Sequence, residues 1–149
     1  MDKPIEEYTT ELIRSSVELR MRRQEVLTRE NPVKLHVILG EAALRYVVGG
    51  ADVMREQYEK IAEMSGWDHI TIQVLPFRRS YRSTNDFAIL DFGNEFPPRV
   101  QTDSAWGSVS TSDKQREVDR FTRRFVAMAA SALPPEDTTE FLQRLEREL

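Results

Sequence analysis

Glu41 is the side chain in this sequence with the clearest potential for chemistry. It follows an apolar segment, and Arg45 lies four residues later, the spacing at which two side chains meet on a helix. The simplest interpretation is an ion pair at a helix start, where a carboxylate also complements the helix dipole. An alternative is a ligand-binding or partner-binding pair. A catalytic interpretation places Glu41 in a pocket with a tyrosine, either Tyr46 or Tyr81.

The segment 76–85 carries three arginines and a tyrosine. Arginine side chains can form paired hydrogen bonds to phosphate, and tyrosine can stack on a ring. This composition predicts one of two things: a site for an anionic ligand or nucleic acid, or a solvated loop with excess positive charge. The residues concerned are Arg78, Arg79, Tyr81 and Arg82.

Metal and nucleophile chemistry is poorly supported by the sequence. There are no cysteines, which excludes disulfides, thiolate metal sites and cysteine nucleophiles. His36 and His69 lie in neighbouring expected strands, but no third ligand accompanies them at a suitable spacing. A triad of Ser104, His69 and Asp103 is not framed by a G-x-S-x-G turn. We therefore expect no metal, no cofactor and no catalytic triad.

Length and composition are those of one globular domain. The chain has 149 residues, of which 40% are hydrophobic and 31% charged, with a net charge of −4. No apolar run approaches the ~20 residues needed to cross a bilayer, and the polar start MDKPIEEY does not resemble a signal peptide. We therefore expect a cytoplasmic protein that does not bind membranes and has no general attraction to nucleic acid.

Apolar periodicity divides the chain into three parts. A long helix is expected over about 4–28, an α/β core over about 34–111 and a C-terminal helical pair over about 112–149. Only the first two strands are separated by a helical crossover, so the later strands are expected to pair antiparallel. The prediction is a single domain, 1–149, of α+β class. A mixed, largely antiparallel sheet of about five strands would pack with helices in two layers.

The first helix has two apolar flanks. One recurs every seven residues and is expected to lie on the core of the domain. The adjoining flank is more than a helix packed on one side needs, which predicts a homodimer interface. The first flank consists of Ile5, Leu12 and Leu19, and the second of Ile13, Val17 and Met21.

Three local features of the core and the C-terminal pair give sharper expectations. The segment 86–92 is apolar on both faces, which predicts a central strand. Gly66 is expected to end a helix in the left-handed conformation. Ser112 and Gln115 have the spacing of a capping box at the start of the next helix.

Four motifs carry a resemblance to a known family. They read LHVILGEAAL over 35–44, VGG over 48–50, VMREQ over 53–57 and IQVLPF over 72–77. At these spacings the chain closely resembles the C-terminal domain, itself of unknown function, of the Scr antitoxin-like regulators of actinobacteria. These regulators are of the Xre helix-turn-helix type, and the resemblance covers about 20–149. In such proteins a separate N-terminal segment reads DNA. Because no such segment is expected here, we expect no direct DNA binding by this chain.

The chain departs from the family pattern at three places. Gly40 stands where relatives carry the first acidic residue before the Ala-Ala-Leu segment. VQTD over 100–103 and SVST over 108–111 replace strands that resemble V-Y-V-E and L-Y-L-E, so two tyrosines are absent. Trp106, in the turn between them, is either an edge plug on the core or an exposed anchor for a partner.

The resemblance implies a non-catalytic, antitoxin-like module for regulatory sensing and protein interaction. Such a module forms a homodimer and binds a small partner protein or a small ligand. One alternative is a stand-alone enzyme of cyclase or isomerase type, recruited from this domain in a biosynthetic pathway. Another is direct nucleic-acid binding through the arginine segment. The expected binding residues are Glu41, Arg45, Arg78, Arg79, Tyr81, Arg82 and Trp106.

Overall fold

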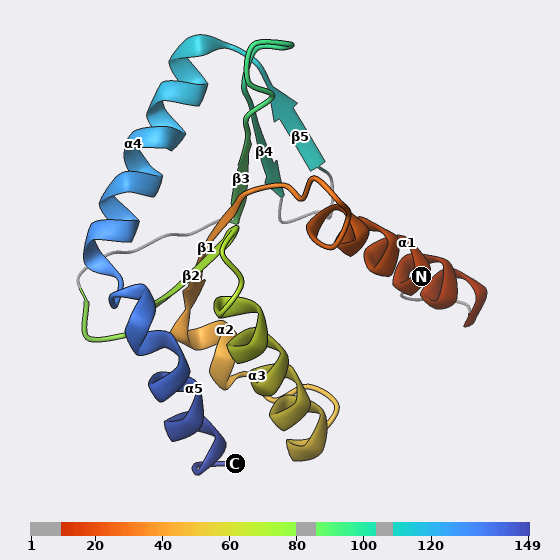
Figure 1. Cartoon of the computed structure of the whole chain (residues 1–149), viewed down its shortest axis with the longest axis vertical. Coiled ribbons are helices and arrows are strands. Elements are labelled where there is room, and N and C mark those ends of the chain that lie inside the picture. The colour runs from red at the N-terminus through yellow and green to blue at the C-terminus, as the bar shows by residue number, and fades with distance from the viewer. Residues whose placement is uncertain (1–9, 80–85, 104–108) are drawn as a thin grey trace, which may run out of the picture.

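The computed structural model of the chain describes residues 10–79, 86–103 and 109–149 (Figure 1). Its α+β class, with five strands that are mostly antiparallel, confirms the predicted class. Two 3-10 turns, Glu25–Leu27 and Pro135–Asp137, precede β1 and the last helix. The main elements are α1 Thr10–Gln24, β1 Leu35–Gly40, α2 Glu41–Arg45, α3 Ala51–Ser65, β2 Ile70–Leu75, β3 Phe87–Leu90, β4 Arg99–Asp103, β5 Val109–Ser112, α4 Gln115–Ser131 and α5 Thr138–Glu146.

The described strands form two sheets. β1 and β2 pair in parallel, with Leu35 opposite Ile70 and Gly40 opposite Leu75. β3, β4 and β5 form an antiparallel sheet in that order. The helices α2 and α3 make the crossover between β1 and β2, as the sequence predicts. Figure 1 shows α4 running alongside both sheets, so this helix links them.

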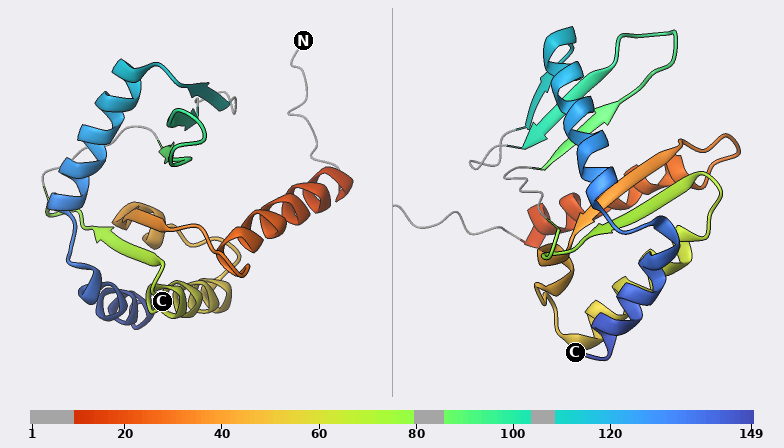
Figure 2. Two further views of the ribbon diagram at one scale, coloured as in Figure 1. Left: turned by 45° about the horizontal axis from the view of Figure 1, so that its top comes forward. Right: turned by 90° about the vertical axis from the view of Figure 1, so that its left-hand side faces the viewer.

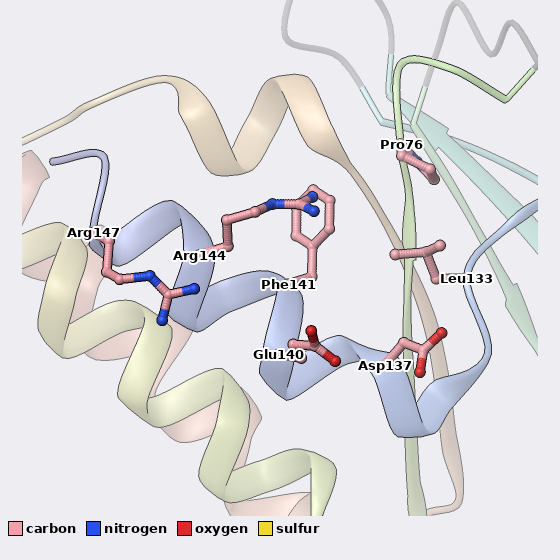
Figure 3. A pocket seen from close by; sticks show the side chains of 7 residues that line it. All are labelled: Pro76, Leu133, Asp137, Glu140, Phe141, Arg144 and Arg147. Atoms are coloured by element: carbon pink, nitrogen blue, oxygen red, sulfur yellow. The ribbon is translucent and has the colours of Figure 1, made fainter.

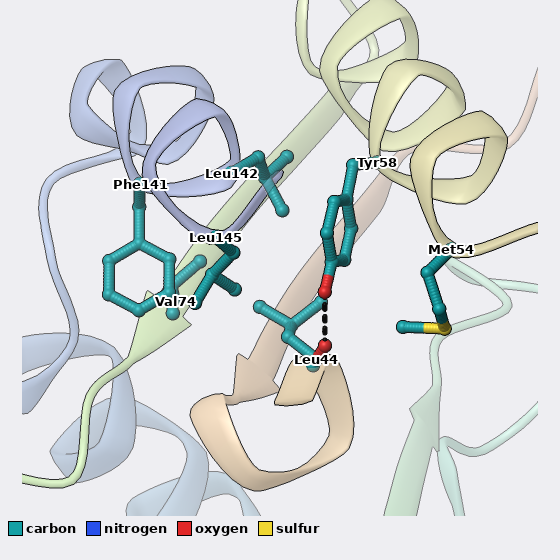
Figure 4. Packing of buried hydrophobic residues seen from close by; sticks show 7 residues of the cluster. All are labelled: Leu44, Met54, Tyr58, Val74, Phe141, Leu142 and Leu145. Carbon is teal, nitrogen blue, oxygen red and sulfur yellow. Dashed lines mark hydrogen bonds between the residues drawn. The ribbon is translucent and has the colours of Figure 1, made fainter. Parts of the chain in front are cut away.

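The main core lies between β2 and the helices α2, α3 and α5 (Figure 4). Apolar residues at helical spacing on α3 and α5 make this possible, because each helix places them along one face. The Tyr58 hydroxyl donates to the Leu44 carbonyl at 2.5 Å, so the polar end of this buried ring has a partner. The buried members of the cluster are Leu44, Met54, Tyr58, Val74, Phe141, Leu142 and Leu145.

The opposite face of the parallel pair packs against α4. There Gln73 is buried, and its amide donates to the carbonyls of Ala129 and Leu133 at 3.3 and 2.9 Å. His36 donates from Nε2 to the Gln73 side-chain oxygen at 2.7 Å, and its ring meets the edge of Phe125 at 4.9 Å. β2 is therefore covered on both faces, and every residue of the strand except Thr71 is buried.

The outer edge of β2 is covered by the connection between α4 and α5. The backbone N–H of Leu133 donates to the Val74 carbonyl at 2.8 Å. Thr138, which is fully buried, donates its hydroxyl to the Ile72 carbonyl at 2.7 Å. These bonds satisfy strand groups that would otherwise face a new strand, so β2 is protected on this side.

The antiparallel sheet departs from one sequence expectation. The strand at 86–92 was expected to be central because it is apolar on both faces, but in the structure β3 is an edge strand and β4 is central. On one face the Phe87 ring packs against Phe121 of α4, and the two ring centroids are 5.0 Å apart. On the other face Ala88 and Leu90 are exposed. The apolar pattern therefore reflects an uncovered face and not a second layer.

The expectation that the first helix lies on the core is wrong for the described residues. α1 has no buried residue, and Figures 1 and 2 show it projecting away from α4 and α5. Leu12 and Leu19, the described members of the flank expected to face the core, are each more than half exposed. The start of the expected helix over 4–9, including Ile5, lies outside the described residues. Within the described part of the chain, no helix is long and apolar enough to cross a membrane.

Candidate functional site

Glu41 sits where β1 ends and α2 begins, and the residue is only 8% exposed. One carboxylate oxygen accepts the backbone N–H of Phe77 at 2.8 Å. The other accepts Nε of Arg45 at 2.6 Å, which is the ion pair that the sequence spacing predicts. A second nitrogen of Arg45 reaches Glu148, also at 2.6 Å. One buried carboxylate thus connects the end of β1, the segment after β2 and the C-terminus.

The charge state of Glu41 follows from this setting. Burial on its own would raise the pKa of the carboxyl group, but the Phe77 N–H, Arg45 and the charge of Arg144 together lower it below the ordinary value. The Arg45 pKa is raised by its bonds to Glu148 and Glu41. Burial raises the Tyr58 pKa, and this hydroxyl stays a neutral donor. Glu41 is therefore a charged acceptor at neutral pH and a weak base.

The structure does not bring the proposed catalytic group together in its described part. Both Glu41 oxygens are engaged, and Tyr46 is 75% exposed. Tyr81, the other candidate tyrosine, lies outside the described residues. The Glu41–Arg45 pair is instead an anchor, because it holds three distant parts of the chain in contact.

Of the other expected binding residues, Arg78 and Arg79 lie in an exposed turn after β2. This turn is closed by the Arg79 N–H, which donates to the Pro76 carbonyl at 3.0 Å. Arg82 and Trp106 fall outside the described residues, so the predictions for them stay predictions.

A pocket that the sequence did not single out opens beside α5 (Figure 3). Its volume is about 260 Å³, and it lies where β2 ends, with Pro76 and Leu133 on one wall. Figure 3 shows two carboxylates toward the start of α5 and two guanidinium groups toward its end. The lining residues are Pro76, Leu133, Asp137, Glu140, Phe141, Arg144 and Arg147.

The charged residues of this pocket recur at positions 137, 140, 144 and 147, which lie on one side of a helix. The Arg144 guanidinium lies over the Phe141 ring, 4.7 Å from its centroid. No ion pair of the described residues joins Arg144 to Glu140, although their spacing favours one. Helical spacing of the charges is the sequence signal that could have found the pocket.

The second flank of α1 is the other feature open to a partner. Ile13 and Val17 are each 53% exposed and Met21 is 58% exposed. They are spaced four residues apart, and Val17 is the central residue of the helix. Arg14 and Arg20 flank the row. The three residues predicted as a dimer interface are thus accessible on one ridge of the helix.

The two histidines have structural partners. His36 bonds to Gln73, and His69 donates to the Leu27 carbonyl at 2.8 Å and stacks on Trp67. No group of three or more histidine, aspartate or glutamate side chains that could hold a metal ion occurs within 10–79, 86–103 and 109–149.

Comparison with known proteins places the chain in a family. The model of one family, described as "Domain of unknown function (DUF5753)", matches residues 2–144, which is almost the whole chain. No curated protein and no solved structure matches it. The chain therefore belongs to the DUF5753 family.

Proposed function

We propose that this chain is the non-catalytic interaction module of a transcriptional regulator, and that two copies associate through α1. The regulator is of the Xre helix-turn-helix type, related to the Scr antitoxin-like proteins of actinobacteria. Support for this kind of protein comes from the four motifs and the resemblance that they carry. The proposed self-association rests on one observation: α1 has no buried residue and carries an exposed apolar ridge.

An isolated helix of this length is marginal in water, since most helical stability in proteins comes from packing of an apolar face. α1 spans 15 residues, none of which is buried, so a covering surface would stabilise it. A second copy is the simplest cover, because the same ridge is then used twice around a two-fold axis. An antiparallel pair centred on Val17 sets Ile13 of one copy beside Met21 of the other.

The four-residue spacing also predicts the crossing angle. Ridges of residues four apart interdigitate at about −50°, the commonest class of helix packing. Contact is then concentrated at the crossing point, here Val17. Arg14 and Arg20, which flank the ridge, can diverge from their counterparts and keep their charges in water. In a full-length regulator, a two-fold pair of this kind would hold two DNA-reading domains at the spacing of two half-sites.

Cross-linking of single-cysteine variants tests this arrangement directly, because the chain has no cysteine of its own. With a short bismaleimide we expect Val17→Cys to form covalent dimers. Ser15→Cys lies on the opposite side of the helix and is the matched control, expected to remain monomeric. Faster cross-linking of the Ser15 variant would place the interface on the flank of Leu12 and Leu19. A lack of cross-linking in both variants would mean that α1 binds a different protein and not a second copy.

A further inference from the structure

The pocket beside α5 lies at the carboxyl end of β2, one strand of the parallel pair. Ligands of α/β sheets commonly bind outside the carboxyl ends of parallel strands. The volume of about 260 Å³ is below the roughly 300–1,000 Å³ of pockets for drug-sized ligands. Only a compact molecule fits.

Among the described residues, the charges of this pocket are not joined to one another in ion pairs, although the charge of Arg144 also acts on Glu41. Glu140 and Arg144 have the i, i+4 spacing that usually gives a surface ion pair. In the structure Arg144 instead lies over Phe141, 4.7 Å from the ring centroid. Within the described residues, no carboxylate lies within ion-pair distance of Arg144 or Arg147. Complementing the helix dipole explains the order of the charges along α5, but it does not explain why this pair is left open.

The lining has three chemical parts. Asp137 and Glu140 are negative, and Arg144 and Arg147 are positive. The rest of the wall is apolar, formed by Pro76, Leu133 and Phe141. Glu140 and Arg144 are separated by about 6 Å along the helix axis, so one small molecule can contact both.

We propose that this pocket binds a free α-amino acid with an apolar side chain. The ammonium group contacts Asp137 and Glu140, the carboxylate contacts Arg144 and Arg147, and the side chain packs on Phe141 and its neighbours. Both charges are needed in one small molecule. The backbone of a peptide terminus carries only one of them, which favours a free amino acid over a peptide segment. The proposal concerns a different surface from α1, so the two can fail independently.

The test is a titration of the ¹⁵N-labelled chain with L-leucine, followed by NMR. We expect saturable shifts of backbone amides in α5 and near Leu133. Two probes remove one charge each: N-acetyl-L-leucine lacks the ammonium group, and L-leucinamide lacks the carboxylate. Each is expected to bind about tenfold more weakly or worse, a loss of roughly 1.4 kcal/mol.

Matched variants assign the effect to the pocket. Arg144→Gln and Glu140→Gln should each weaken leucine binding about tenfold or more. Arg123→Gln on α4 and Glu56→Gln on α3, both exposed positions outside the pocket, should leave it unchanged. The amide spectra show at the same time that each variant is folded. The proposal is overturned by an absence of saturable shifts up to about 10 mM, ten times a weak dissociation constant of about 1 mM. Equal affinity for either blocked analogue also overturns it.

Discussion

The Glu41 carboxylate accepts the backbone N–H of Phe77 at 2.8 Å. This one bond joins the Glu-Ala-Ala-Leu segment to the Leu-Pro-Phe segment, which lie more than thirty residues apart in the sequence. Two of the four motifs that carry the sequence resemblance are therefore two sides of one contact. The role of Glu41 that follows from this contact is structural, and it can be measured.

Replacing Glu41 tests this role by its effect on stability. Glu41→Ala removes charge-assisted hydrogen bonds and leaves the Phe77 N–H without its partner, so we expect a loss of about 2–3 kcal/mol in the free energy of unfolding. Glu41→Gln keeps one acceptor oxygen and should lose about 1 kcal/mol. Glu148→Gln is the control, because this partner of Arg45 is 46% exposed and should cost less than about 1 kcal/mol. Urea unfolding gives all three values, and a Glu41→Ala variant as stable as the parent would contradict the structural role.

The pH dependence of stability should carry the signature of the same carboxylate. Because the folded-state pKa of Glu41 is lowered from its ordinary value of 4.5, its contribution is complete above that value. It is lost as the pH falls through the lower folded-state pKa. We therefore expect the stability difference between the parent and Glu41→Gln to shrink below pH 4.5. A difference that stays constant into more acidic solution would mean that Glu41 is not stabilised as a carboxylate.

Tyr58 offers a second stability test with a matched control. Its hydroxyl donates to the buried Leu44 carbonyl, so Tyr58→Phe leaves an acceptor unpaired in the core. We expect a loss of about 1 kcal/mol. Tyr46→Phe makes the same chemical change at a 75% exposed position and should change stability by less than about 0.5 kcal/mol. Equal effects of the two variants in thermal unfolding would be evidence against the packing shown in Figure 4.

The arginines after β2 are expected to be dispensable for both folding and self-association. Arg78 and Arg79 are exposed, and substitutions at such positions usually change stability by less than about 0.5 kcal/mol. Replacing them and Arg82 by Ser should leave the melting temperature and the size of the assembly almost unchanged. A folded triple variant that no longer associates would transfer the interface from α1 to this segment.

Local patterns in the sequence predicted the parallel pair well. The stripe of Met54, Tyr58 and Ile61 and the alternation along β2 are each set by one element, so they can be recognised without knowing the rest of the fold. The Glu41–Arg45 pair is predictable for the same reason, because both residues belong to α2. The bond from Glu41 to Phe77 is not predictable in this way, since it depends on how β1 and β2 align.

Other expectations are wrong at positions where the conformation depends on adjoining elements and not on the local sequence alone. Gly66 ends α3 with φ of −87°, so the left-handed cap is absent. The predicted capping box is not formed, because Ser112 belongs to β5 and the position before α4 is Lys114. The apolar residues on α1 and β3 indicate surfaces that a neighbour could cover. They do not indicate whether that neighbour belongs to the same domain. The pocket beside α5 was missed because the charges along that helix look like ordinary dipole compensation.

Self-association through α1 is tested most directly by measuring mass in solution. By light scattering at tens of micromolar, we expect the parent chain to have the mass of two chains. The double variant Ile13→Lys with Val17→Lys places like charges across the interface and should have the mass of one chain. Its circular dichroism spectrum should be unchanged, because both positions are exposed in the single chain. Ser15→Lys with Leu19→Lys adds the same charge on the other side of α1 and should remain a dimer. A parent chain that is monomeric at these concentrations would contradict the account.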